Sequence, residues 1–202
     1  MMNNILLQGI TGQLFTGGGG GCTPVVGSSL TVGFGTSNAS YAPFYGLYDF
    51  SWYAMIFVQS ELGATKQITG IEVEVSSYTT PYIVNNQTIK IYHISESIFD
   101  STPAVNLSDL TLLDETIVKA NFTFTISPNG WQTINFDNNF CFNGTDNILI
   151  SWENRDGTWT SGFGNGEYAV KTSKASYKAS DDNYPTGNGT RTNGRINIKF
   201  KY

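Results

Sequence analysis

The sequence is poor in charged residues, cysteine and histidine. Charged residues make up 13% of its 202 residues, where an average soluble domain has roughly 25%. The net charge is −5, which excludes nucleic-acid binding through a basic surface. The chain holds one histidine and two cysteines. A structural zinc site takes four such ligands, so this class of site is excluded as well.

Long hydrophobic runs are also missing. The longest apolar stretch, Trp52–Val58, is seven residues long, whereas a membrane-spanning helix needs about 20. The start, MMNNILLQGITG, lacks the basic region, long apolar segment and cleavage site of a secretory signal. We therefore expect the chain to fold in the cytoplasm and to keep Cys22 and Cys141 as free thiols. A disulfide between them is the alternative.

Glycine and aromatic residues are abundant, with 22 glycines and 14% aromatics. Tyr, Phe, Trp and Thr favour strands, while Gly, Asn and Ser favour turns. Apolar and polar residues alternate in Lys66–Tyr78 and in Gln87–Ile94, as in half-buried strands. No long segment has a helical period, and we expect at most one helical turn, near Ser95–Phe99 or Leu107–Leu110. Further strands are predicted at Val25–Phe34, Glu115–Ile126, Gly130–Phe136, Asn147–Trp152, Glu167–Thr172 and Arg195–Tyr202.

This spacing of strands and turns predicts an all-β fold, a two-sheet antiparallel β-sandwich of jelly-roll type. We expect the sandwich to span residues 41–202. Residues 1–40 are predicted to form a separable N-terminal arm, since the Gly17–Gly21 tract is a flexible linker. Within the arm, Ile5–Leu7 is suited to add a strand to a partner's sheet edge. Alternatively, it completes the chain's own sheet.

Nothing in the sequence forms a recognisable catalytic set, and we expect no enzymatic activity. His93 lies inside a predicted strand without a nucleophile motif, so we expect its ring to pack and to hydrogen-bond locally. We expect no cofactor, although the Asp181-Asp182-Asn183 loop allows a structural Ca²⁺ ion. Paired carboxylates could hydrolyse glycosides, but we interpret them as solvated surface charges: Glu72/Glu74, Asp114/Glu115, Glu153/Asp156 and Asp181/Asp182.

The segment after the strand at Asn147–Trp152 is the best candidate for a binding site. It reads WENRDGTWTSGFGNGEY, with aromatic and charged residues among glycines. Such aromatics can stack on sugar rings or anchor a protein interface; alternatively, they cap one end of the sandwich. A second aromatic cluster, Tyr41–Phe57, is assigned mainly to the core. The predicted ligand- or partner-binding residues are Glu153, Arg155, Asp156, Trp159, Phe163 and Tyr168.

Both aromatic clusters also carry a resemblance to a family of proteins. The chain resembles β-sandwich modules of Bacteroidota surface and secreted proteins, and structural (virion) proteins of the bacteriophages of these bacteria. The similarity covers about residues 41–160, and its motifs are mostly packing and turn signatures. The matching pieces are PFYGLYDFSWYAMIFVQSELG, QITGIEVEV, QTIKIYHISESIFDSTP, NGWQTINF and FCFNGTDNILISWENRDG.

The resemblance implies a non-enzymatic structural protein of a bacteriophage virion, such as a capsid decoration, head-fibre or tail-associated protein. Its expected partners are other virion proteins or copies of itself, in a homo-oligomer, with a surface glycan as a further ligand. No nucleic acid or membrane is expected as a partner. The expected location is the virion, assembled in the host cytoplasm. The alternative is a carbohydrate-binding or adhesion module of a bacterial surface protein, located at the cell surface.

Overall fold

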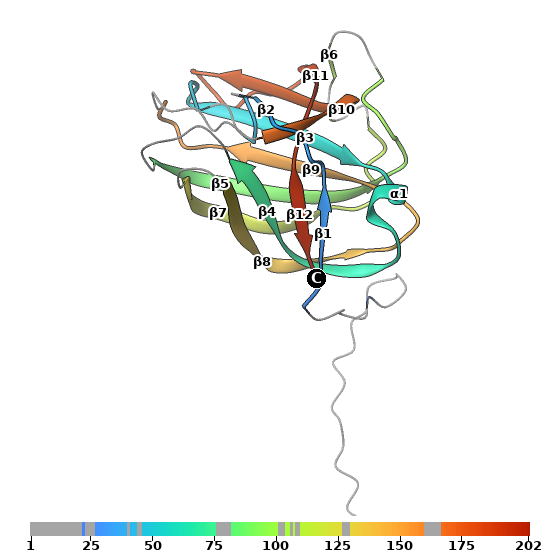
Figure 1. Ribbon diagram of the computed structural model, residues 1–202. Helices are drawn as coiled ribbons and strands as arrows, with labels where there is room; N and C mark the ends of the chain where they lie inside the picture. The colour runs from blue at the N-terminus through green and yellow to red at the C-terminus, as the bar shows by residue number, and fades with distance from the viewer. Residues whose placement is uncertain are drawn as a thin grey trace, which may run out of the picture.

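Two antiparallel β-sheets pack face to face in the computed structural model, as Figure 1 shows. The all-β, two-sheet sandwich predicted from the sequence is therefore confirmed, while the jelly-roll assignment stays a prediction. The structure describes residues 22, 27–39, 41–43, 46–75, 82–100, 104–105, 107, 110–126, 130–159 and 167–202.

The smaller sheet has four strands. β4 and β8 are long and pair from end to end, with a register shift between Ile68 and Gly70. The sheet follows the order β1 (Ser29–Val32), β12 (Ile198–Lys201), β4 (Lys66–Val75) and β8 (Gly130–Phe142). β1 therefore lies at one edge of this sheet and β8 at the other.

The larger sheet has eight strands, with the short β2 (Ser37–Asn38) pairing on β10 beside the main path. The path runs β6 (Ala104–Val105), β11 (Gly189–Ile196), β10 (Glu167–Ser180), β3 (Phe50–Phe57), β9 (Asn147–Asn154), β5 (Tyr82–Ile94) and β7 (Thr116–Ile126). β3 and β9 are central strands, so the aromatic segment around Trp52 lies in the middle of the sheet.

The main core lies between the two sheets and follows the predicted alternation. Ile71 and Val73 are fully buried, and Ile198 and Phe200 of the neighbouring strand pack in the same cluster. Glu72 and Lys199 lie opposite each other on the outer face and form an ion pair of 2.7 Å. Alternation in the sequence therefore indicated correctly which face of this sheet is buried.

The larger sheet is also covered on its outer face. β3 is buried on both faces, because Trp52, Ala54 and Ile56 form a second apolar cluster outside the sandwich. The β5–β6 connection contributes Phe99 to this cluster, and Tyr184 of the β10–β11 loop packs against it. This second layer forms the floor of the candidate site described below.

The prediction that residues 1–40 form a separable arm is wrong for residues 27–39. β1 pairs with β12 along its whole length, and Val32 and Ala39 belong to the main core. β1 fits this sheet because its apolar residues point toward the core, as in the other strands of the sheet. The Ile5–Leu7 piece and the Gly17–Gly21 tract lie outside the described residues.

One helical turn lies where it was expected, at Leu107, and a second one was not predicted. The second, α1 (Gln59–Leu62), follows β3, and the Glu61 carboxylate accepts a hydrogen bond from the Val58 backbone N–H (3.2 Å). The Ser95–Phe99 segment has no helical residue. Between Leu107 and Leu110 there is a turn hydrogen bond of 3.3 Å. A four-residue helix is too short to leave a period in the sequence.

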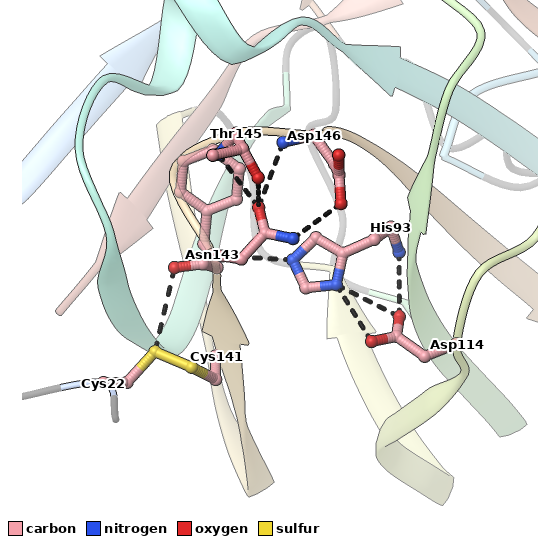
Figure 2. Close-up of polar contacts among 8 residues, drawn as sticks. Cys22, His93, Asp114, Cys141, Asn143, Thr145 and Asp146 are labelled. Carbon is pink, nitrogen blue, oxygen red and sulfur yellow. Dashed lines mark hydrogen bonds and ion pairs between the residues drawn. A yellow bond between two sulfur atoms is a disulfide. The ribbon is translucent and has the colours of Figure 1, made fainter. Parts of the chain in front are cut away.

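Cys22 and Cys141 form a disulfide, so the expectation of free thiols is wrong (Figure 2). Their Cα atoms lie 5.7 Å apart, and Cys141 lies near the end of β8. The bond links the segment ahead of β1 to the opposite edge of the same sheet. Disulfides persist mainly in oxidising surroundings.

Candidate functional site

Glu153 is the centre of the candidate site. It is the next-to-last residue of β9 and points to the outer face of the larger sheet, where its residue surface is 7% exposed. One carboxylate oxygen lies 3.0 Å from Lys90 Nζ, and the other lies 2.9 Å from Arg155 Nε. The expectation that Glu153 is a solvated surface charge is therefore wrong. Both partners compensate the cost of burying this carboxylate.

Arg155 connects Glu153 to an aromatic ring. Its guanidinium lies 3.5 Å from the centre of the Tyr184 ring, in a cation–π contact. Burial raises the pKa of Tyr184, and the negative charge of Glu153 raises it further. The Tyr184 hydroxyl therefore remains protonated and can donate a hydrogen bond at neutral pH.

A similar tyrosine lies on the other side of Lys90. The Tyr92 hydroxyl donates a 2.6 Å hydrogen bond to Glu115, and Glu115 lies 3.8 Å from Lys90 Nζ. Burial and this hydrogen bond raise the pKa of Tyr92. On the outer face, Glu115, Lys90, Glu153 and Arg155 thus form a row of alternating charges. The neutral phenols of Tyr92 and Tyr184 contact its two ends.

A small pocket of about 190 Å³ opens beside Glu153. Trp52 forms its floor, and the Trp52 indole N–H donates a 3.1 Å hydrogen bond to the Pro185 carbonyl, which holds the β10–β11 loop in place. Pockets for drug-sized ligands usually measure 300–1,000 Å³, so this one suits a single sugar ring or one side chain. The lining residues are Trp52, Leu107, Glu153, Tyr184, Pro185, Thr186 and Gly187.

Among the other predicted site residues, Trp159 has an exposed side chain. Its surface is 63% accessible, so it does not cap the core. Asp156 lies in the turn after β9, where its backbone N–H donates to Asn154 (3.2 Å). Tyr168 is a strand residue of β10 that pairs with Ser37 and Ile196. Phe163 lies outside the described residues. The structure therefore brings Glu153 and Arg155 into one site and leaves Trp159 at the surface.

The sequence analysis missed Lys90, Tyr92 and Tyr184 as parts of this site. Lys90 and Tyr92 share one face of their strand, and that alternation could have indicated a polar outer face. Tyr184 comes from a loop with no such pattern, so only the fold brings it to Arg155.

His93 forms a separate polar cluster, shown in Figure 2. Its Nδ1 lies 3.0 Å from an Asp114 carboxylate oxygen, and its Nε2 accepts a hydrogen bond from the Asn143 backbone N–H (3.2 Å). This pattern assigns a neutral imidazole whose Nδ1–H donates to Asp114. Its ring packs 4.7 Å from that of Phe140. The prediction that His93 packs and hydrogen-bonds locally is confirmed.

The Asn143 side chain organises the turn beside this histidine. Its amide oxygen accepts hydrogen bonds from the backbone N–H groups of Thr145 (2.9 Å) and Asp146 (3.0 Å). Its amide nitrogen donates to the Asp146 carboxylate at 2.6 Å. With both ring nitrogens engaged, His93 has no free lone pair to act as a base, and the cluster joins β5 to the β8–β9 turn.

No group of three or more His, Cys, Asp or Glu residues suited to a metal ion occurs in the described part of the chain. Asp181 and Asp182 lie in an exposed loop, and the structural Ca²⁺ ion stays a prediction there. Of the described helices, none is long and apolar enough to cross a membrane. No protein-family model matches the chain, and a comparison with curated proteins found no match.

Proposed function

We propose that this protein is a non-enzymatic structural component of a bacteriophage virion: a capsid decoration, head-fibre or tail-associated protein. The observation that supports a non-enzymatic role is the state of its titratable groups. His93 has both ring nitrogens engaged, and Glu153 is held between two cations. Such groups stabilise a fold and are not poised for proton transfer. The virion setting comes from the sequence resemblance alone.

In this role, the protein acts through contacts with neighbouring virion proteins and with the host surface. The exposed Trp159 ring and the pocket beside Glu153 are the proposed contact site. A large aromatic side chain in solvent is a common anchor of protein and glycan recognition. Arg155 and Tyr184 add a charged and a hydroxyl donor beside Glu153.

The disulfide favours a second candidate, an adhesion or carbohydrate-binding module at a bacterial cell surface. Disulfides form in oxidising surroundings, such as the cell exterior, and Cys22–Cys141 joins distant parts of the chain. The small pocket is lined by aromatic residues, Trp52 and Tyr184, and by Glu153, a composition suited to a sugar subsite.

The two candidates differ in where the protein is found and share the contact site. If the proposal is right, antibodies against the protein will label purified virions; labelling of uninfected cells alone would support the second candidate. For the contact site, we expect Trp159→Ala to weaken binding to host cells about 30-fold, as loss of a central aromatic anchor of about 2 kcal/mol does.

The matched control is Leu113→Ala, which removes another exposed apolar side chain (54%) from a different part of the surface. We expect it to bind host cells like the wild type. A Trp159→Ala variant that binds normally would contradict the assigned contact site. A variant whose unfolding free energy falls by the same amount would show that the ring has a structural role.

A further inference from the structure

One edge of β1 has no strand partner among the described residues. Ser28 and Tyr202 exchange both backbone hydrogen bonds, at 2.9 and 3.0 Å. In an antiparallel pair, such hydrogen-bonded residues alternate with residues whose backbone groups point the other way. The N–H and C=O groups of Ser29 and Thr31 therefore point away from β12, toward the open edge.

Among the described residues, this edge lacks charges and proline, although α1 lies close to β1. Proteins protect sheet edges with charged residues, proline or bulges, and residues 28–35 (SSLTVGFG) contain no charge and no proline. At the other edge of the sheet, Asp137 of β8 forms an ion pair of 2.8 Å with Lys119 of β7. The β1 edge is the one left as a template for another strand.

Phe34, just after β1, is 84% exposed and is presented on a fixed loop. The buried Asn197 side chain accepts a hydrogen bond from the Gly35 N–H (3.1 Å) and donates one to the Gly35 carbonyl (2.7 Å). Gly33 has φ +96°, and a Cβ there would lie 2.7 Å from Asn197 Oδ1. Because the buried Asn197 side chain fixes the backbone at Gly35, the exposed Phe34 ring is pre-organised for a contact with another molecule.

The surface around β1 is also hollowed, and its charges are balanced. Phe34 stands between hollows of about 540 and 330 Å³. A third hollow of about 380 Å³ includes Gly27, Ser28 and Ser29, at the opposite end of the strand. Although the chain has a net charge of −5, the residues that line these hollows carry as many positive as negative charges. The charged lining residues are Glu61, Glu72, Glu74, Lys171, Lys199 and Lys201.

We propose that β1 pairs antiparallel with β1 of a second copy of the chain across a two-fold axis. Outward-pointing residues must face each other, so Ser29 of one copy faces Thr31 of the other, with Leu30 on the axis. A register with Thr31 on the axis would place Ser29 opposite Gly33, whose φ of +96° departs from a strand. The antiparallel arrangement brings Phe34 to the hollow at Gly27–Ser29 of the second copy. This dimer goes beyond the proposed function, because it applies to a virion protein and to a surface module alike.

Sedimentation equilibrium over a range of concentrations tests the dimer. We expect the full-length protein to dimerise and Phe34→Ala to raise the dimer dissociation constant about 30-fold. Ile83→Ala, which removes an exposed apolar side chain (56%) from β5, is the matched control and should leave dimerisation unchanged. A wild-type protein that stays monomeric up to millimolar concentration would overturn the proposal, as would a Phe34→Ala variant that dimerises normally.

Disulfide crosslinking tests the register. Facing residues of a hydrogen-bonded antiparallel pair have Cα atoms about 5.5 Å apart, within the range that a disulfide spans. The native cysteines are already paired, so a mixture of Ser29→Cys and Thr31→Cys proteins should form covalent heterodimers, while each variant alone should not. Equal crosslinking of each variant alone would overturn this register. If deleting residues 1–20 abolished dimerisation, the N-terminal segment would be the contact and the proposal would be wrong.

Discussion

His93 joins two segments that are far from it in the sequence. Its ring donates to Asp114 and accepts from the Asn143 N–H. Because the imidazole is buried, no water can easily replace it for the Asn143 N–H. An unsatisfied buried donor costs about 1–3 kcal/mol. The only histidine of the chain thus stabilises the β8–β9 turn.

We therefore expect His93→Phe to lower the free energy of unfolding by about 1–3 kcal/mol, although the new ring can still pack on Phe140. His93→Gln, which can keep one hydrogen bond, should lose less. Urea unfolding monitored by tryptophan fluorescence measures both. Equal stability of His93→Phe and the wild type would show that the hydrogen bonds contribute nothing, contrary to the argument above.

Arg195 is the largest buried cation of the described residues, and Glu61 is its counter-ion. The guanidinium donates two hydrogen bonds to the Glu61 carboxylate, at 2.7 and 2.8 Å, and one to the Ile56 carbonyl. Burial alone raises the pKa of Glu61, but the hydrogen bonds and charge of Arg195 lower it below its ordinary value. A carboxyl with a lowered pKa stabilises the fold above its ordinary pKa, and this stability is lost as the pH falls through the lowered value.

Two results should follow from replacing Glu61 by Gln. At neutral pH, Glu61→Gln leaves the buried Arg195 without a counter-charge, and we expect a loss of about 3–5 kcal/mol in the free energy of unfolding. In acid, the variant should lose less further stability than the wild type, since the titrating group is absent. Urea unfolding at neutral and at acidic pH gives both values. Parallel pH profiles for the two proteins would contradict the assigned role of Glu61.

At the scale of elements, the disulfide has the largest expected effect. It closes a separation of 119 residues between Cys22 and Cys141. Such a crosslink restricts the unfolded chain, and a native disulfide typically contributes about 2–4 kcal/mol.

We expect the double variant Cys22→Ser/Cys141→Ser to lose about 2–4 kcal/mol in the free energy of unfolding. Reductant should destabilise the wild type by a similar amount and leave the double variant unchanged, which separates the loss of the bond from the effect of the substitutions. Wild-type stability that is indifferent to reductant would contradict the prediction.

The strands that the sequence predicted most directly are those with a clear apolar alternation. β12 follows it throughout and β4 follows it on either side of Gly70, because one face is buried and the other is partly exposed. β11 (GTRTNGRI) has no such pattern and was predicted only at its last residues, 195 and 196. It is a strand because β10 and β6 pair with it. β11 is therefore extended because segments far away in the sequence pair with it, and the residues of β11 alone do not predict this.

The candidate site was predictable only in part, for the same reason. Glu153 and Arg155 were recognised because they lie in a segment rich in aromatics and glycines. Their partners, Lys90 and Tyr184, lie 63 and 31 residues from Glu153 in the sequence. These residues meet because β5 pairs with β9 and the β10–β11 loop folds over the sheet. Burial of Glu153 follows from that packing, which composition alone does not reveal.

At the scale of the whole molecule, no described residue before Val32 is fully buried in the core, although Leu30 packs against it. The main cluster is built from residues 32–200, and the earliest described contact is the disulfide at Cys22. The prediction of an N-terminal arm that attaches the domain to a partner therefore applies to the residues before Cys22. The chain from residue 1 to residue 21 includes the Ile5–Leu7 piece that was predicted to bind a partner's sheet edge.

A variant that lacks residues 1–20 tests this division, because it keeps Cys22 and its disulfide. We expect its free energy of unfolding to stay within about 0.5 kcal/mol of the wild-type value, as for changes away from a packed core. Its incorporation into virions, measured by co-sedimentation, should fall if residues 1–20 attach the domain. The β1 dimer should persist in this variant, since Ser29, Thr31 and Phe34 are untouched. A loss of several kcal/mol would instead place the Ile5–Leu7 piece in the chain's own sheet, and normal incorporation would rule out the attachment role.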